Sequence, residues 1–432
     1  MVARMGCRVA FGWICLLWLC RPAFACVGDC NRDCQVDVSE IIVGIGIALG
    51  EAGIDACASF DADGSDAVEV HEIVGAVQVA LDGCARELSF AEPTPYEVGN
   101  APRSLVLHDF DGDGFLDVAT GNHGSDDVSL LINDGKAVLA EQDRVVVGHV
   151  PLGIAAGDFD GDGNGDVATA NGGSANVSVL FGNGDGQLGR RVDLPAGTDA
   201  RTILAADVDG NGELDLVVAA PGIAGIPVLL GRGDGTFERI VVGSGFRSWW
   251  IAHGDVTGDG IADLVSANAE SSDLAVLAGR AGGGFTQRLR TPLAEAPFSV
   301  AIADVDHDGA ADLVTGNGRN ASLSLLRGQG GTFAEPVRLA VGEGPFPVHI
   351  ADVDGDGNPD LLTVTESTAS GDVSIRLGHG DGTFAEERRW AVGRLPYAVA
   401  IGDLDRDGAL DVIAATGTAN QVVVLRQVGC GR

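Results

Sequence analysis

Most of the chain alternates short apolar segments with turns rich in glycine and aspartate. From residue 88 onward the apolar segments are rich in Val, Ile, Leu and Ala, as in GIAAGDFD, DVATANGG and NVSVLFGNGDGQL. Alternation of apolar and polar positions, together with frequent Val and Ile, favours β-strands over helices. Short strands with regularly spaced turn signals therefore predict an all-β fold.

One nine-residue segment recurs through this region. DFDGDGFLD begins at Asp109, and related segments begin at Asp158, Asp207, Asp255, Asp304, Asp352 and Asp403, at steps of 48 to 51 residues. Each repeat holds four segments of strand length, which is typical of propeller blades. The spacing predicts a seven-bladed β-propeller over residues 87–432. An open solenoid of the same repeats is the alternative.

The two ends of the repeat region appear in the sequence as parts of one blade. The last repeat ends at its third strand, QVVVLRQVGCGR, whereas LSFAEPTPYEVG, which begins at Leu88, resembles the fourth-strand segment GTFAEPVRLAVG of an earlier repeat. We therefore expect the N-terminal segment to close the ring by completing the last blade. A closed ring needs such a split blade, whereas an open solenoid does not.

The nine-residue segments have the composition of cation-binding loops. Ca²⁺ takes six to eight oxygen ligands, which positions 1, 3, 5 and 9 and a backbone carbonyl at position 7 would supply. Glycine at position 6 permits a tight turn, and the apolar residue at position 2 is expected to pack inward. The sequence predicts seven calcium sites, of which the loop with Thr257 should bind most weakly. Solvated Asp-Gly turns without a metal are the alternative.

The predicted side-chain ligands of these loops are Asp109, Asp111, Asp113 and Asp117; Asp158, Asp160, Asp162 and Asp166; Asp207, Asp209, Asn211 and Asp215; Asp255, Thr257, Asp259 and Asp263; Asp304, Asp306, Asp308 and Asp312; Asp352, Asp354, Asp356 and Asp360; and Asp403, Asp405, Asp407 and Asp411.

The seven loops resemble the calcium loops of integrin-α-type propellers, the FG-GAP or VCBS repeat family. The resemblance covers about 345 residues and extends to motif, spacing and copy number. It implies that each loop joins the first and second strands of a blade on one face, and that ligands bind the opposite face.

Residues 26–86 differ in kind and predict a small helical calcium module. Two twelve-residue segments, DCNRDCQVDVSE and DADGSDAVEVHE, place acidic or polar groups at EF-hand positions and end in the glutamate typical of that loop. Each runs into a helix-like segment, although Cys34 and Asp66 stand where glycine is usual. The predicted ligands are Asp29, Asn31, Asp33, Asp37 and Glu40 in the first loop, and Asp61, Asp63, Ser65, Glu69 and Glu72 in the second.

The arrangement of two loops, each followed by a helix, resembles a dockerin, and this resemblance implies docking to a cohesin-like partner. A calcium-stabilised spacer is the alternative. If every predicted loop in both parts of the chain binds one ion, we expect up to about nine calcium ions.

The first 25 residues have the features of a secretory signal peptide. Arg4 and Arg8 precede the apolar run from Val9 to Cys20, and Ala23-Phe24-Ala25 forms a cleavage site after Ala25. A buried helix or an anchor is the alternative. The rest of the chain has no apolar stretch long enough to span a membrane. The sequence therefore predicts a secreted protein.

Six cysteines follow the signal peptide: Cys26, Cys30, Cys34, Cys57, Cys84 and Cys430. An even number in a secreted chain predicts disulfides. Cys84 and Cys430 flank the two strands expected to close the ring, so a bridge between them is one prediction. Pairing of Cys84 within the N-terminal module is the alternative.

The net charge of the chain and the residues at the starts of its strands indicate the kind of binding partner. The chain has 62 acidic and 27 basic residues, a formal net charge of −35, which argues against nucleic acid. At or near the start of the innermost strands, opposite the loops, stand arginines and aromatic residues that should ring the channel mouth. Packing at strand starts is the alternative explanation. These candidate ligand-binding residues are Arg103, Arg201, Arg247, Trp249, Phe298, Phe346 and Tyr397.

These features predict a secreted calcium-binding protein that acts as an extracellular binding or adhesion module for protein or polysaccharide. The alternative is a carbohydrate-active enzyme, a lyase or hydrolase, or its lectin-like accessory component attached through the dockerin-like domain. No catalytic residue is predicted, because the eight histidines follow no spacing typical of a triad or metal site. Arg232-Gly233-Asp234 is interpreted as one variant of a hairpin turn that recurs as GNGDG and GHGDG.

Overall fold

A computed structural model of the chain describes residues 38–48, 68, 73, 88–243, 247–281, 283–318, 320–365 and 371–428. The chain divides into two units, Met1–Cys84 with Cys430–Arg432, and Ala85–Gly429. In the first unit the structure describes helix α1 (Val38–Ala48), which overlaps the segment 41–50 that the sequence predicts to be helical. The predicted signal peptide, the six remaining cysteines, the EF-hand ligands other than Glu40, and the Glu40 side chain lie outside the described residues.

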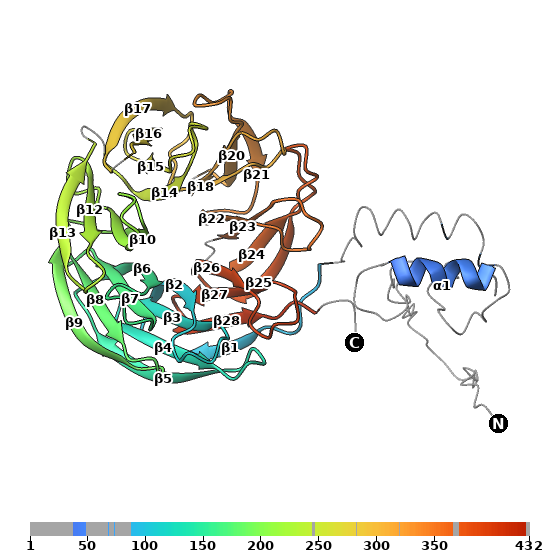
Figure 1. Ribbon diagram of the computed structural model, residues 1–432, viewed down its shortest axis with the longest axis horizontal. Helices are drawn as coiled ribbons and strands as arrows, with labels where there is room; N and C mark the ends of the chain where they lie inside the picture. Colours follow the sequence, from blue (N-terminus) through green and yellow to red (C-terminus); the bar gives the residue numbers. More distant parts are fainter. Residues whose placement is uncertain are drawn as a thin grey trace. The chain divides into compact units, whose positions relative to one another are not determined.

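The second unit is an all-β, seven-bladed propeller, as predicted, and each blade is a four-stranded antiparallel sheet (Figure 1). Blade 1 contains β2 (Pro102–His108), β3 (Asp117–Asn122), β4 (Asp127–Asn133) and β5 (Leu139–Val146). Blade 2 contains β6 (Pro151–Gly157), β7 (Asp166–Asn171), β8 (Asn176–Gly182) and β9 (Leu188–Pro195). Blade 3 contains β10 (Thr202–Ala206), β11 (Asp215–Ala219), β12 (Ile226–Gly231) and β13 (Phe237–Val242).

Blades 4 to 7 repeat this order. Blade 4 contains β14 (Trp250–Gly254), β15 (Asp263–Asn268), β16 (Asp273–Gly279) and β17 (Phe285–Pro292). Blade 5 contains β18 (Ser299–Ala303), β19 (Asp312–Asn317), β20 (Ser322–Leu326) and β21 (Val337–Ala340). Blade 6 contains β22 (Pro345–Ala351), β23 (Asp360–Thr365), β24 (Gly371–Arg376) and β25 (Arg388–Gly393). Blade 7 contains β26 (Pro396–Gly402), β27 (Asp411–Thr416), β28 (Gln421–Leu425) and β1 (Thr94–Glu97).

Blade 7 takes its fourth strand from the start of the propeller sequence. β1 pairs antiparallel with β28, with Thr94 opposite Val424 and Glu97 opposite Gln421. Blades 7 and 1 also share an apolar cluster, in which Leu404 and Ile413 of blade 7 lie with Val118 and Leu131 of blade 1. Strand pairing and side-chain packing thus both join the two ends of the repeat region.

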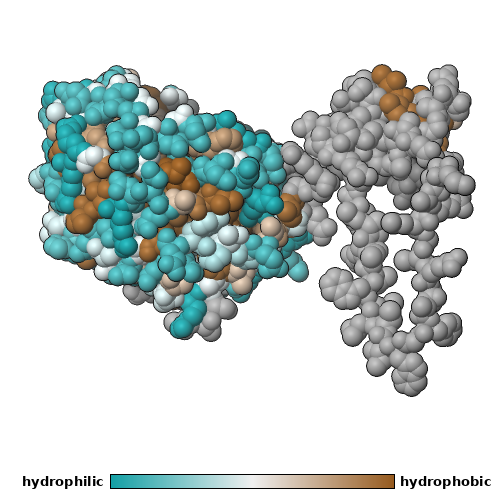
Figure 2. All heavy atoms as spheres, turned by 90° about the horizontal axis from the view of Figure 1, so that it is seen from below, coloured by the Kyte–Doolittle hydropathy of each residue, from teal (hydrophilic) through white to brown (hydrophobic). Residues whose placement is uncertain are grey.

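The four strands of a blade differ in burial because they lie at different depths. The first strands surround the centre of the ring, and β5, β9, β13 and β17 lie at its outer edge (Figure 1). The second strands, such as β3 and β7, are buried along their whole length. The fourth strand β5 exposes most of its residues. Figure 2 shows hydrophilic side chains over most of one side of the propeller, with smaller hydrophobic patches between them.

The hydrophobic core lies between blades rather than inside a single sheet. The apolar position-2 residue of each aspartate loop takes part in it, as the sequence predicts. Phe110 packs with Ala119 and Leu130 of its own blade and with Ile154 and Val167 of blade 2. Six of the seven position-2 residues are buried, and Val208 is partly buried. Each loop is therefore fastened to the next blade by its second residue.

This packing predicts that Phe110→Ala destabilises the propeller. The Phe110 side chain is 1% exposed, and truncating a buried phenylalanine costs about 3–5 kcal/mol because a cavity remains. Denaturant unfolding followed by tryptophan fluorescence measures the loss. The control is Val146→Ala on the outer strand β5, where the residue is 65% exposed and the expected change is below about 0.5 kcal/mol. Equal changes in both variants would contradict the interblade core.

Candidate functional site

The seven aspartate loops occupy equivalent places in the propeller. Each connects the first strand of its blade to the second, as in blade 1, where β2 ends at His108 and β3 begins at Asp117. These two residues are directly opposite each other in the antiparallel pair. The loops therefore lie at one end of the inner strands, all on the same face of the ring.

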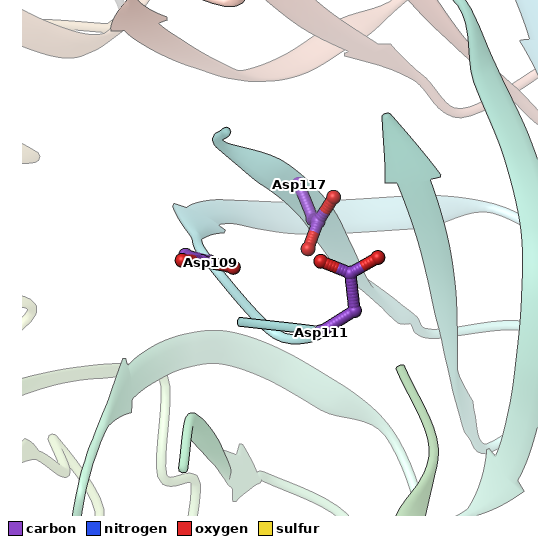
Figure 3. A group of neighbouring side chains, drawn as sticks. All are labelled: Asp109, Asp111 and Asp117. Carbon is purple, nitrogen blue, oxygen red and sulfur yellow. The ribbon is translucent and has the colours of Figure 1, made fainter. Parts of the chain in front are cut away.

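In the first loop, three carboxylates converge on one small volume (Figure 3). Asp109 and Asp111 come from the loop and Asp117 from the start of β3, and one oxygen from each lies within 4.8 Å of the others. The carboxylates of Asp111 and Asp117 face each other, with Asp109 across the loop. Such a group could hold a metal ion, and comparable groups are formed by Asp158, Asp160 and Asp166; Asp207, Asp209 and Asp215; Asp304, Asp306 and Asp308; and Asp352, Asp354 and Asp356.

The loop backbone is shaped by its own aspartates and glycines. The carboxylate of Asp109 accepts hydrogen bonds from the N–H groups of Gly112 at 2.8 Å and Gly114 at 2.9 Å. The glycine at position 6 has a positive φ in all seven loops, 89° at Gly114, a conformation that other residues adopt with strain. The tight turn predicted at this position is confirmed.

The ninth residue of each loop has a second role that the sequence analysis missed. The Oδ2 atom of Asp117 accepts the N–H of Phe110 and its Oδ1 atom accepts the N–H of Asn133, both at 2.8 Å. The same two bonds recur in all seven blades, at 2.7 to 3.0 Å. The position-9 aspartate is therefore a clamp between its loop and the end of the third strand. The signal available in the sequence was an aspartate at the start of each apolar second strand.

Several of the position-9 carboxyl groups are weaker acids than ordinary aspartates because they are buried. Burial, reinforced by the neighbouring carboxylates, raises the pKa of Asp166, Asp360 and Asp411 to about 7 and that of Asp117 to about 6. The same causes raise the pKa of Asp354 to about 6. A bound cation would favour the ionised carboxylates and so oppose this shift.

The loops differ in what compensates their charge. In blades 2, 5 and 7 an arginine lies beside the position-3 aspartate, with N–O distances of 3.3 Å for Arg190–Asp160, 3.6 Å for Arg327–Asp306 and 3.2 Å for Arg426–Asp405. In the fourth loop the hydroxyl of Thr257 is buried and has no hydrogen-bond partner among the described residues. In the third loop the amide of Asn211 donates to the carbonyl of Gly231 at 3.1 Å.

A cavity of about 470 Å³ lies at the other end of the inner strands. Its walls include the starts of the first strands of blades 1, 2, 3, 4, 6 and 7. Most lining residues are apolar, among them Leu105, Ile154, Ile203 and Val399. A concave, largely apolar cavity of this size with a few polar groups is typical of small-ligand sites.

Arginine and aromatic side chains pair at this cavity. The guanidinium carbon of Arg103 lies 3.6 Å from the ring centre of Tyr397, and that of Arg201 lies 3.9 Å from the Trp249 ring centre. The Trp249 ring meets Phe298 edge-on at 5.1 Å between centroids. Trp250 meets Phe346 in the same way at 5.3 Å. Each contact joins different blades, so the site forms only when the blades pack into a ring.

Six of the seven candidate ligand-binding residues line this one cavity: Arg103, Arg201, Trp249, Phe298, Phe346 and Tyr397. The seventh, Arg247, is absent from the lining; its exposed side chain lies 3.7 Å from Glu270. Trp250 and Leu152, which stand beside the candidates in the sequence, also line the cavity. So does His349, whose pKa burial lowers to about 4, so that it is neutral at pH 7. The sequence analysis missed His349, although it lies three residues after Phe346 in the same strand.

Comparisons with known proteins agree with this architecture. A family described as FG-GAP-like repeat matches residues 109–169, 158–218, 255–315 and 304–363, half of the chain. A search of curated protein sequences gives no match.

Solved structures share the fold at low sequence identity. The structure of BBS1N in complex with ARL6DN has a TM-score of 0.57 and 13% identity, with 78% of this chain and 96% of that one covered. Hydrazine synthase from Kuenenia stuttgartiensis has a TM-score of 0.53 and 13% identity, with 77% and 97% covered. Within the part of the chain that the structure describes, no helix has the length and apolar character needed to cross a membrane.

The raised carboxyl pKa values predict that metal-free protein loses stability as the pH rises from 7.0 to 8.5. The folded state holds these protons more tightly than the unfolded chain, whose aspartates titrate near pH 4, so the contribution is lost as the pH rises through about 7. Unfolded histidines, which titrate near pH 6.5, are mainly neutral over this interval.

Denaturant unfolding of chelator-treated protein at the two pH values tests this prediction. Asp411→Asn should reduce the pH dependence, whatever it does to the overall stability. Asp234→Asn is the control, because hydrogen bonds to Thr236 lower the pKa of this exposed hairpin carboxylate. Equal free energies of unfolding of the unaltered protein at both pH values would contradict the raised pKa values.

Proposed function

Because the chain belongs to the family of proteins with FG-GAP-like repeats, we propose that it is a secreted calcium-binding protein whose propeller recognises an extracellular protein or polysaccharide. The observation that carries the proposal is the separation of two kinds of site along the inner strands. Acidic loops lie at one end of these strands, and the arginine–aromatic cavity lies at the other. Cation binding would then stabilise the ring without occupying the recognition surface.

The chemistry of the loops supports calcium as the cation. Their candidate ligands are carboxylates with an occasional amide or hydroxyl, a set of hard oxygen donors without His or Cys. Ca²⁺ accepts many oxygens in a flexible geometry, whereas Mg²⁺ requires near-octahedral geometry and retains several waters. Glycine-rich loops that already bend around the carboxylates suit the larger ion. The same argument extends to the EF-hand-like loops of residues 26–86, for which a cohesin-like partner remains part of the proposal.

The chemistry of the cavity supports binding. Arg, Trp and Tyr are the residues that most often dominate the energetics of recognition sites. The carbohydrate-active enzyme proposed as the alternative would need an acid–base pair at the reacting bond. Among the described residues that line the cavity, the titratable side chains are Arg103, Arg201, His349 and Tyr397, without a carboxylate. We therefore base the proposal on recognition.

Calcium removal is the first test. A single site at a calcium concentration 100-fold above its Kd stabilises the folded state by about 2.7 kcal/mol. Chelation should therefore lower the Tm of the full chain by at least about 5 °C, and calcium, but not an equal concentration of magnesium, should restore it. An unchanged Tm would contradict the calcium proposal.

A variant of the weakest loop sharpens this test. Thr257→Asp supplies the missing carboxylate, so it should increase the number of bound calcium ions and raise the Tm in calcium but not in chelator. Thr286→Asp adds the same charge on the exposed outer strand β17 of the same blade and serves as the control. Equal calcium counts in the two variants would contradict the assignment of position 3 as a ligand.

Ligand capture tests the recognition role. The calcium-loaded chain is applied to a glycan array and used to capture extracellular proteins, in parallel with Trp249→Ala and with Val241→Ala, which alters the exposed outer strand β13. Trp249→Ala should weaken binding at least about tenfold, because truncation of a central aromatic residue commonly costs 2 kcal/mol or more. Val241→Ala should leave it unchanged. Polysaccharide turnover without stable binding would instead support the enzyme alternative.

A further inference from the structure

The cavity differs in charge from the rest of the protein. The chain has 62 acidic and 27 basic residues, yet the described lining of the cavity contains Arg103 and Arg201 and neither Asp nor Glu. Arg201 is paired with Asp199, so Arg103 is the group that places an uncompensated positive charge in a largely apolar wall of a strongly negative molecule. Apolar surroundings also strengthen electrostatic interactions relative to bulk water.

The guanidinium groups retain hydrogen-bonding capacity. Among the described residues, no carboxylate lies within ion-pair distance of Arg103, whose guanidinium stacks on the face of Tyr397. Arg201 donates through Nε to Asp199 at 3.0 Å, and within the described part of the chain its two terminal nitrogens make no hydrogen bond. Several N–H donors therefore remain for a ligand, and the planar guanidinium suits two-point recognition of a carboxylate.

The stacking also changes what the aromatic residues present. Arg103 covers one face of Tyr397 and Arg201 covers one face of Trp249, so these faces are not open for a neutral sugar ring to stack on. Stacking holds each guanidinium in place before a ligand arrives, which reduces the entropy lost on binding. The aromatic rings that remain, Phe298, Phe346 and Trp250, provide apolar contacts for the C–H groups of a ligand.

The volume of the cavity favours a small chemical group as its ligand over the surface of another protein. A volume of about 470 Å³ is that of a small-ligand site, whereas a standard protein interface covers about 800 Å² on each partner and is much flatter. One terminal unit of a glycan can enter such a cavity while the rest of the chain remains outside.

We propose that the cavity binds the negatively charged end of an acidic oligosaccharide, with the carboxylate of a terminal uronate at Arg103. The inference rests on the proposed recognition function of the same cavity and specifies its ligand class. Arg103 determines the preference for an anion, Arg201 offers its terminal N–H groups nearby in the same cavity, and the aromatic residues contact the sugar ring.

Isothermal titration of the calcium-loaded full chain tests the proposal. The probe is a trisaccharide with a terminal glucuronate, and its matched control is the trisaccharide with glucose in that place. The acidic probe should bind at least about tenfold more tightly than the neutral one, and added salt should weaken its binding because charges are involved. An acetylated tripeptide of aspartates is the third probe and should bind more weakly than the glucuronate probe.

Arginine variants test which side chain binds the carboxylate of the acidic trisaccharide. Arg103→Gln should weaken binding of the acidic trisaccharide at least about tenfold, and the double variant with Arg201→Gln should remove measurable binding. Arg103→Lys, which retains the charge but loses the planar fork, should give an intermediate affinity. Arg247→Gln is the matched control, because this exposed arginine lies outside the cavity lining, and it should leave affinity within about twofold of that of the unaltered chain. The Tm in calcium of each variant establishes that it is folded.

The outcomes separate this inference from the broader proposal. Equal binding of the two trisaccharides, or equal losses in Arg103→Gln and Arg247→Gln, would overturn the uronate site. Preference for the aspartate peptide would overturn the sugar class. If an array glycan or a captured protein binds through Trp249 while the uronate probe does not, the recognition function stands and the uronate inference fails. If nothing binds through the cavity, both fail.

Discussion

The two hydrogen bonds accepted by the ninth aspartate of each loop fix the geometry on which the propeller depends. In blade 1 the carboxylate of Asp117 joins the N–H of Phe110, at the start of the loop, to that of Asn133, at the end of the third strand. Buried backbone donors need partners, and these N–H groups lie where a loop interrupts the sheet ladder. One side chain therefore holds three strands of a blade in register, and it does so seven times around the ring.

This constraint also sets up an electrostatic problem. Burial of the carboxylate at position 9, reinforced by the like charges at positions 3 and 5, raises the pKa of Asp166 to about 7. Loop N–H groups offset part of the repulsion, and in three blades an arginine lies beside the position-3 aspartate. The calcium ions that we propose would offset the remainder. The crowding of aspartates is thus tied to the architecture of the blade.

The direction of the inner strands determines which residues lie on the face opposite the acidic loops. Each strand that ends at an acidic loop begins on the cavity side, so in blade 1 Arg103 and Asp109 mark its two ends. Seven strands arranged in this way collect acidic groups on one face and strand-start residues on the other. Recognition and cation binding are therefore separated by the length of a strand, although both depend on the same packing between blades.

The sequence by itself determined the features that depend on local pattern. The strand type, the repeat, the left-handed glycine at Gly114 and the inward packing of Phe110 follow from residue order, because each depends on neighbours in the chain or on the repeat period. The arginine and aromatic residues at strand starts likewise indicated the cavity side. Only the tertiary structure decided which of those residues meet. Arg247 and Trp250 lie three positions apart, yet only Trp250 reaches the cavity, and His349 joins it from within a strand. The pairs Arg103–Tyr397 and Arg201–Trp249 come from different blades, so their contacts follow from the ring as a whole and from no single stretch of sequence.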